Sequence, residues 1–127
     1  MKIFIALIFI SITFLSSKVS ANTPVCSSAS GGYCQYSGKV NRIYINSGNI
    51  ILIYFERALD VSEAEAVGMN ISNGGAAAFK VSNNPEFAQM FYSTALTAQA
   101  SGRDVSIQMR GVESGYLAFD RIWLSAP

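Results

Sequence analysis

The chain has no histidine, and charged residues make up only 13% of its 127 residues. Histidine is the usual general base beside a serine or cysteine nucleophile, and it is also the commonest metal ligand. Its absence excludes Ser-His-Asp and Cys-His catalysis and removes the ligand that most protein metal sites use. We therefore predict a protein that is not an enzyme and that needs no metal or cofactor.

No apolar run in the chain is long enough to cross a membrane. The longest, residues 3–15, falls short of the roughly 17 to 25 residues that a spanning helix needs. It follows a short positive start and precedes Val19-Ser20-Ala21, the small-residue pattern of a signal-peptide cleavage site. These features predict a signal peptide over 1–21 with cleavage near Ala21, a secreted or periplasmic location, and a single mature domain over 22–127.

Positive charge is also scarce. The whole chain has 9 basic and 8 acidic residues, and loss of Lys2 and Lys18 with the signal peptide leaves 7 basic against 8 acidic, a net charge of −1. A near-neutral domain has no electrostatic footprint for nucleic acid or for an anionic membrane surface. We therefore expect no nucleic-acid partner.

The only two cysteines, Cys26 and Cys34, both lie in the mature part of the chain. In an exported protein an even number of cysteines predicts a disulfide. The loop between them is rich in serine and glycine, and closing so short a loop contributes about 2.5 kcal/mol to stability. A metal site would have only these two thiolates as candidate ligands, so we predict the disulfide.

Hydrophobic periodicity predicts three strands, one helix and two further strands. In order, the strands lie at 36–45, 50–55 and 66–72, the helix at 84–102, and the last strands at 104–110 and 115–125. Residues 76–81 are a strand extension or a hairpin arm. The order β-β-β-α-β-β in a small secreted domain predicts a mainly β fold with one α-helix, a five-stranded barrel of the OB type.

The helix has the clearest boundaries in the chain. Asn84 is a good N-cap, and Gly102 suits the left-handed residue that ends a helix. Phe87, Met90 and Phe91 follow helical spacing along one face, which we expect to pack on the barrel. The strand at 50–55 is apolar on both faces, so its second face should meet either this helix or a neighbouring subunit.

Two further patterns concern the last strand and the acidic residues. In the last strand, alternation places Leu117, Phe119, Arg121 and Trp123 on one face. The acidic stretch 56–65 lacks the spacing of a calcium loop and is expected to be a solvated loop. Glycoside hydrolysis would need two facing carboxylates, and the candidate pairs, which lie in no distinctive motif, are Glu56 with Asp120 and Glu113 with Asp60.

Three segments together resemble a known family. They are Tyr36-Ser37-Gly38, residues 91–98 and residues 101–107, and they resemble the pentameric B subunits of bacterial toxins of the subtilase-cytotoxin and pertussis-like type. The resemblance spans roughly 35–124. It implies an OB-type barrel, a homopentameric ring with helices lining a central pore, and binding of sialylated glycans on host cells. It also implies that Gln89, Ser93 and Gln99 face the neighbouring subunits or the pore.

The resemblance also implies a set of glycan-binding residues. Ser37 matches the serine that bonds the sugar carboxylate, although a Ser-Gly pair that simply starts a strand explains it equally. Met109 stands where the subtilase relative has a sugar-contacting tyrosine, and the adjacent Arg110 could pair with an acidic sugar or simply be exposed at a strand end. Tyr36 and Tyr33 are candidate stacking platforms.

Two functions follow as expectations from these residues. The first is a secreted, non-catalytic glycan-binding protein of the B-subunit type that delivers a toxin A subunit to host cells. The second is a secreted protein-interaction module or inhibitor on the same barrel, with no affinity for sugars. The family joins its central strands by a disulfide, whereas the cysteines here lie near the N-terminus, so the scaffold could persist with a different ligand.

Overall fold

The structure of the protein, a computed structural model, describes residues 21–127. The predicted signal peptide therefore lies, apart from Ala21, outside the described residues. Within 21–127 no helix is both long and apolar enough to cross a membrane.

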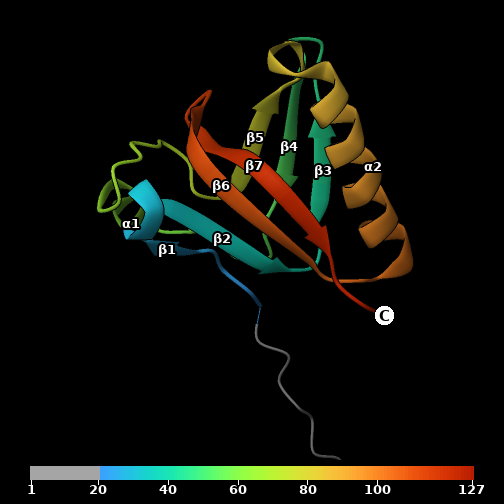
Figure 1. Cartoon of the computed structure of the whole chain (residues 1–127), viewed down its shortest axis with the longest axis horizontal. Helices are drawn as coiled ribbons and strands as arrows, with labels where there is room; N and C mark the ends of the chain where they lie inside the picture. Colours follow the sequence, from blue (N-terminus) through green and yellow to red (C-terminus); the bar gives the residue numbers. More distant parts are fainter. Residues whose placement is uncertain (1–20) are drawn as a thin grey trace, which may run out of the picture.

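Seven strands form one sheet in the order β1-β2-β6-β7-β5-β4-β3 (Figure 1). All neighbouring strands are antiparallel except β5 and β7, which are parallel. The mainly β fold with one main helix is confirmed, but the sheet is not closed, so a five-stranded barrel is not confirmed. The strands are β1 Val25–Ser27, β2 Tyr33–Gly38, β3 Arg42–Ile45, β4 Ile50–Tyr54, β5 Ala76–Lys80, β6 Val105–Glu113 and β7 Tyr116–Leu124.

The predicted first strand is divided in two. Residues 39–41 separate β2 from β3, and the two halves pair with different neighbours, β2 with β6 and β3 with β4. The break is held by side chains, because the Tyr36 hydroxyl donates to the Lys39 carbonyl and the Asn41 amide donates to the Phe55 carbonyl. A link of three residues therefore connects β2 and β3, which lie near opposite ends of the strand order. Because the link is so short, the sheet must curl to bring its two ends close together.

The predicted third strand at 66–72 is wrong. The chain there turns back instead, because the Val67 and Met69 amides both bond the Ala64 carbonyl and Gly68 has a φ of 89°. The third long strand is β5, in the segment expected to be a strand extension or hairpin arm. The acidic stretch before the turn is also not only a loop, since it contains the short helix α1, Val61–Glu65.

The helix prediction is confirmed. Helix α2 spans Pro85–Ser101; the Asn84 side chain accepts a hydrogen bond from the Phe87 amide, and Gly102 ends the helix in the left-handed conformation. Phe91 is buried and stacks on Phe119 with ring centroids 3.6 Å apart, so this face packs on the sheet as expected. Met90, however, is 64% exposed and does not belong to the packed face.

Strand β4 is apolar on both faces, and the faces belong to different clusters. Ile51 and Ile53 lie in the main core together with the buried residues of α2. Leu52, on the other face, belongs to a second cluster with Ala76 and Ala78, partly covered by tyrosine and isoleucine side chains. The helix therefore covers only one face of β4, and a neighbouring subunit over the second face stays a prediction.

Candidate functional site

Strand β7 changes its buried face at a bulge. Gln108 pairs with Arg121 and Met109 pairs with Phe119, so Asp120 is an extra residue on β7 with no partner on β6. Before the bulge Phe119 points into the core, and after it Ile122 and Leu124 do so. Bulges turn the side chains that follow them to the other face. The predicted common face of Leu117, Phe119, Arg121 and Trp123 is therefore wrong beyond Phe119, and Arg121 and Trp123 point outward.

Trp123 completes a row of side chains across three strands, here called the outer row. Ser37 of β2 pairs with Ser106 of β6, and Ser106 pairs with Trp123 of β7. The two serine hydroxyls are 2.9 Å apart, and Trp123 is 47% exposed. Because their sequence neighbours fill the core, the outer row projects from the opposite face of the sheet. An exposed indole thus lies beside a pair of hydroxyls.

The next row on this face consists of Gln35, Gln108 and Arg121. The Oε1 atom of Gln108 is buried and has no hydrogen-bond partner among the described residues. Buried polar side-chain atoms in native proteins nearly always have one. The guanidinium of Arg121 bonds the carboxylate of Asp120 at 2.8 Å, so it is held at the bulge beside this row.

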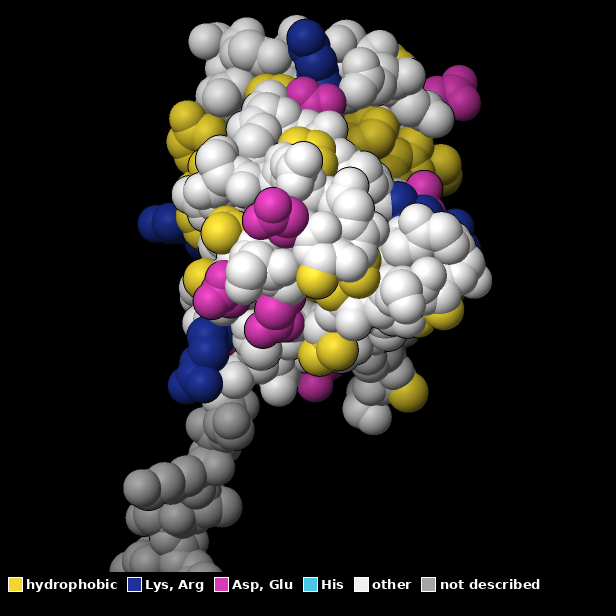
Figure 2. Space-filling view, turned by 90° about the vertical axis from the view of Figure 1, so that its left-hand side faces the viewer, with side chains coloured by type: hydrophobic (Ala, Val, Ile, Leu, Met, Phe, Trp, Pro, Cys, Tyr) yellow, Lys and Arg dark blue, Asp and Glu magenta, His cyan; other side chains and the backbone are white. Residues whose placement is uncertain are grey.

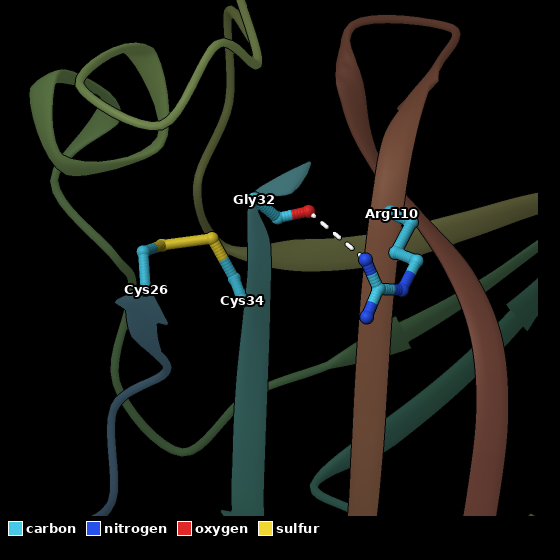
Figure 3. Close-up of a disulfide and its surroundings, with 4 residues drawn as sticks. All are labelled: Cys26, Gly32, Cys34 and Arg110. Atoms are coloured by element: carbon cyan, nitrogen blue, oxygen red, sulfur yellow. Dashed lines mark hydrogen bonds between the residues drawn. A yellow bond between two sulfur atoms is a disulfide. The ribbon is translucent and has the colours of Figure 1, made fainter. Parts of the chain in front are cut away.

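Arg110 lies further along β6 and holds the N-terminal hairpin. Its Nη1 atom donates to the Gly32 carbonyl at 3.4 Å, the bond drawn in Figure 3. The same atom donates to the Ser30 carbonyl at 2.8 Å. Its guanidinium carbon also lies 5.2 Å from the centroid of the Tyr33 ring. Arg110 and Tyr33 are therefore joined to each other and to the hairpin, which gives Arg110 a structural role without any ligand.

The predicted disulfide is confirmed in the same hairpin. Cys26 and Cys34 are directly opposed across β1 and β2 and are bonded to each other, and Figure 3 shows the bond beside the carbonyl that Arg110 contacts. The disulfide joins β1 to β2 and lies away from the outer row.

Two of the predicted glycan-binding residues lie in the core. Tyr36 and Met109 are both fully buried, because they alternate with the outward-facing residues of β2 and β6. The Tyr36 hydroxyl donates to the Lys39 carbonyl at 2.5 Å and to Glu56 Oε2 at 3.2 Å, and burial raises the pKa of Tyr36 well above its usual value. Neither residue presents a surface on which a sugar could rest. Ser37 and Arg110 do lie on the outer face.

A polar cavity of about 480 Å³ begins where the outer row ends. Lys39 follows the last residue of β2, and its Nζ lies 2.7 Å from Asp104 Oδ1 and donates to the Gly102 carbonyl. Arg103 donates from Nε to the Ser125 carbonyl at 2.8 Å. These bonds tie the end of α2 to the ends of the strands and leave two cations and one carboxylate on the cavity wall.

The carboxylates that hydrolysis would require are engaged elsewhere. Glu56 accepts bonds from Tyr36 and from the Asn22 amide, Asp120 pairs with Arg121, and the Oε2 atom of Glu113 accepts from Asn83. In residues 21–127 no three acidic, cysteine or histidine side chains lie close enough together to hold a metal ion. The outer face with its cavity is therefore the best-formed candidate site.

Trp123 is the residue that periodicity misplaced. All four core-facing residues of β7 are apolar, but Leu117 and Phe119 are at odd positions and Ile122 and Leu124 are at even ones. In a regular strand, odd and even positions face opposite sides of the sheet. One buried face can therefore hold both pairs only if the strand has an extra residue between them. That pattern was the available indication of the bulge. Comparisons with protein-family models, curated proteins and solved structures find no match for the chain.

Proposed function

We propose that the protein is a secreted, non-catalytic glycan-binding protein of the toxin B-subunit type, and that the outer row is its binding site. The observation that carries the proposal is the exposed Trp123 beside the hydroxyl pair of Ser37 and Ser106. A sugar ring has an apolar face that an aromatic ring can cover, and a rim of hydroxyls that serine side chains can bond. The outer row offers both groups within three neighbouring strands.

The polar cavity favours an acidic glycan, such as a sialylated one on host cells. It continues from the outer row and carries Lys39 and Arg103, whose bonds to protein oxygens leave further N–H groups free to donate. A sugar carboxylate in the cavity would share these donors. Charge-assisted hydrogen bonds of this kind are stronger than neutral ones. Ser37, which the resemblance assigns to the carboxylate, lies two residues before Lys39, which lines the cavity.

The strand pairing supports an OB-type barrel as the scaffold. When β2 and β3 are taken as two halves of one bent strand, the sheet has five strands besides the short β1: this bent strand, β4, β5, β6 and β7. The bent strand would then pair on one side with β6 and on the other with β4, which is how such a barrel closes. The position of α2 between β5 and β6 in the chain fits the same topology.

If the protein acts as a toxin B subunit, the resemblance implies that it forms a homopentamer that carries an A subunit. Helix α2 offers a surface for self-association, because Glu86 is the only charged residue of its 17. The second apolar face of β4 has no helix over it, but Leu52, Ala76 and Ala78 on that face are already buried within the chain. Exposed helices normally carry many charges, so an uncharged one suits an interface or a pore lining. Light scattering on the mature chain would give the mass of the assembly.

The binding site can be tested with the chain's own fluorescence, because Trp123 is its only tryptophan. A glycan array identifies the ligand, and titration with that ligand should change the emission of Trp123. Trp123→Ala should weaken binding by about 2 kcal/mol, roughly 30-fold, the usual cost of removing a central aromatic anchor. Ser37→Ala should weaken it by about 1 to 3 kcal/mol by leaving a sugar oxygen unpaired.

Tyr44→Ala is the matched control, since Tyr44 is an aromatic of similar exposure on β3, away from the outer row. It should bind glycan as the wild type does. If no glycan binds, or if Trp123→Ala and Tyr44→Ala behave alike, the outer row is not a sugar site. The second function, a protein-interaction module, would then be favoured.

A further inference from the structure

The predicted cleavage site lies at the surface of the folded domain. Ala21 and Asn22, the residues on either side of it, are both exposed. Figure 2 views the molecule from the side of β1 and α1, and it shows the described chain beginning at the lower edge of this face, below the acidic side chains gathered in its middle. Cleavage between the two residues would therefore place a new amino terminus at the surface.

The residues that follow the cleavage site are fixed to the loop after β4. The Arg57 amide donates to the Asn22 carbonyl at 3.0 Å, and the Thr23 hydroxyl donates to the Ala58 carbonyl at 3.0 Å. The next residue, Pro24, is fully buried. The chain is therefore held in place from the first residue of the predicted mature protein, and Asn22 has a defined position beside this loop.

The backbone nitrogen of Asn22 faces a carboxylate that is already positioned. It donates to Glu56 Oε2 at 3.3 Å. The hydroxyl of Tyr36, which is fully buried, donates to the same oxygen at 3.2 Å. Glu56 is partly buried and forms no ion pair within residues 21–127. Its carboxylate thus has no cationic partner in this part of the chain, and it lies beside the atom that would become the amino terminus.

Gly38, the last residue of β2, leaves the space in which this contact forms. A Cβ atom at this position would lie 2.5 Å from Glu56 Oε2 and 2.8 Å from Asn22 Nδ2. Both distances are too short for a carbon atom, so any side chain at residue 38 would displace one of the two residues. The close approach of Asn22 to Glu56 therefore depends on a glycine here.

We propose that Glu56 is the docking site of the mature amino terminus. Hydrolysis by a signal peptidase adds water across the Ala21–Asn22 peptide bond, and it leaves a carboxylate on Ala21 and an α-ammonium group on Asn22. The neutral amide that donates to Glu56 becomes a cation in the same place, because an α-amino group is mostly protonated at pH 7. A charge-assisted hydrogen bond is about twice as strong as a neutral one.

Removal of the signal peptide therefore stabilises the folded domain by turning a hydrogen bond into an ion pair. The device ties the start of the mature chain to the loop after β4 and, through the Tyr36 hydroxyl, to the core. It rests on the predicted signal peptide and is independent of sugar binding.

Two measurements test the proposal. Intact-mass analysis of the exported protein should give a chain of residues 22–127. Urea unfolding at pH 7 then compares this chain with one that begins at Val19, which keeps the Asn22 amide but moves the ammonium group three residues away. The equilibrium constant for unfolding should be about 2- to 5-fold higher for the longer chain, as expected for loss of an exposed ion pair.

Removal of the carboxylate charge isolates the ion pair from other effects of the extension. Glu56→Gln keeps an oxygen that can accept from Tyr36, and in this variant the longer and the mature chain should unfold alike. Glu63→Gln is the matched control, because it removes the charge of an exposed glutamate on α1 and should leave the effect of the extension unchanged.

Three results would overturn the inference. They are an exported chain that begins at a residue other than Asn22, an extension that leaves the unfolding constant of the wild type unchanged, and an extension that changes it by the same factor with and without the Glu56 carboxylate. Circular dichroism and Trp123 emission show that each variant is folded before it is compared.

Discussion

Deletion of Asp120 tests the bulge that places Trp123 on the outer face. Without this residue, Phe119 and Arg121 become consecutive, and the pairs Phe119 with Met109 and Arg121 with Gln108 continue as a regular ladder. Arg121 and Trp123 should therefore stay on the outer face, and Ile122 and Leu124 should stay packed against the core. If β7 instead alternated regularly through residue 120, the same deletion would turn every later side chain to the other face.

The cost follows from the burial of these side chains. Full burial of an aliphatic side chain contributes about 1.5 to 3 kcal/mol. Ile122 and Leu124 are partly buried, so a switch of faces that removed both from the core would cost about 2 to 3 kcal/mol. Such a switch would add a penalty of several kcal/mol for drawing the Arg121 charge into the core. Because both side chains keep their places without Asp120, the deletion should cost only about 0.2 to 1 kcal/mol, the contribution of the lost exposed ion pair.

Urea unfolding, followed by the emission of the single tryptophan, measures both quantities at once. Emission of the folded variant should stay at the wild-type wavelength. It would shift to shorter wavelength if Trp123 entered the core and to longer wavelength if the strand detached. Asp120→Ala is the control, because it keeps the residue and loses only an exposed ion pair worth about 0.2 to 1 kcal/mol. A deletion variant with shifted emission and a loss about 2 kcal/mol or more beyond that of Asp120→Ala would refute the assignment of the bulge.

Three further predictions concern the core and the hairpin. Tyr36→Phe should cost about 1 to 3 kcal/mol at neutral pH, since the Lys39 carbonyl loses its donor. Burial raises the pKa of Tyr36, so above about pH 10 the unfolded state releases the phenol proton while the folded state keeps it. The free energy of unfolding of the wild type should therefore fall as the pH rises above about 10, and Tyr36→Phe should lack this part of the fall. Urea titrations at pH 7 and 11 would measure the difference. Phe91→Ala should cost about 3 to 5 kcal/mol in thermal or urea unfolding, whereas Met90→Ala on the exposed side of α2 should cost under about 1 kcal/mol. Reduction of the disulfide should lower stability by about 2.5 kcal/mol, and equal unfolding curves with and without reductant would contradict this.

Local chemistry in the sequence determined the elements with short-range causes. Asn84 and Gly102 predicted both ends of α2 because caps satisfy backbone groups within one turn of the helix. Alternation predicted the inward face of β6 over residues 105–109. The two cysteines, in a chain with a predicted signal peptide, predicted the disulfide between them. The scarcity of charge and the lack of histidine are the basis for the prediction of a non-catalytic protein, which stays a prediction.

Only the tertiary structure decided which residues share the candidate site. Periodicity assumes an uninterrupted strand, so it could not show that one extra residue at 120 turns Trp123 outward to stand beside Ser37 and Ser106. It also gave no sign that the break after Gly38 sends β2 and β3 to different neighbours, because strand pairing depends on residues far away in the chain. Tyr36, an aromatic that the sequence offered to a sugar, is buried because its hydroxyl bonds the link at that break.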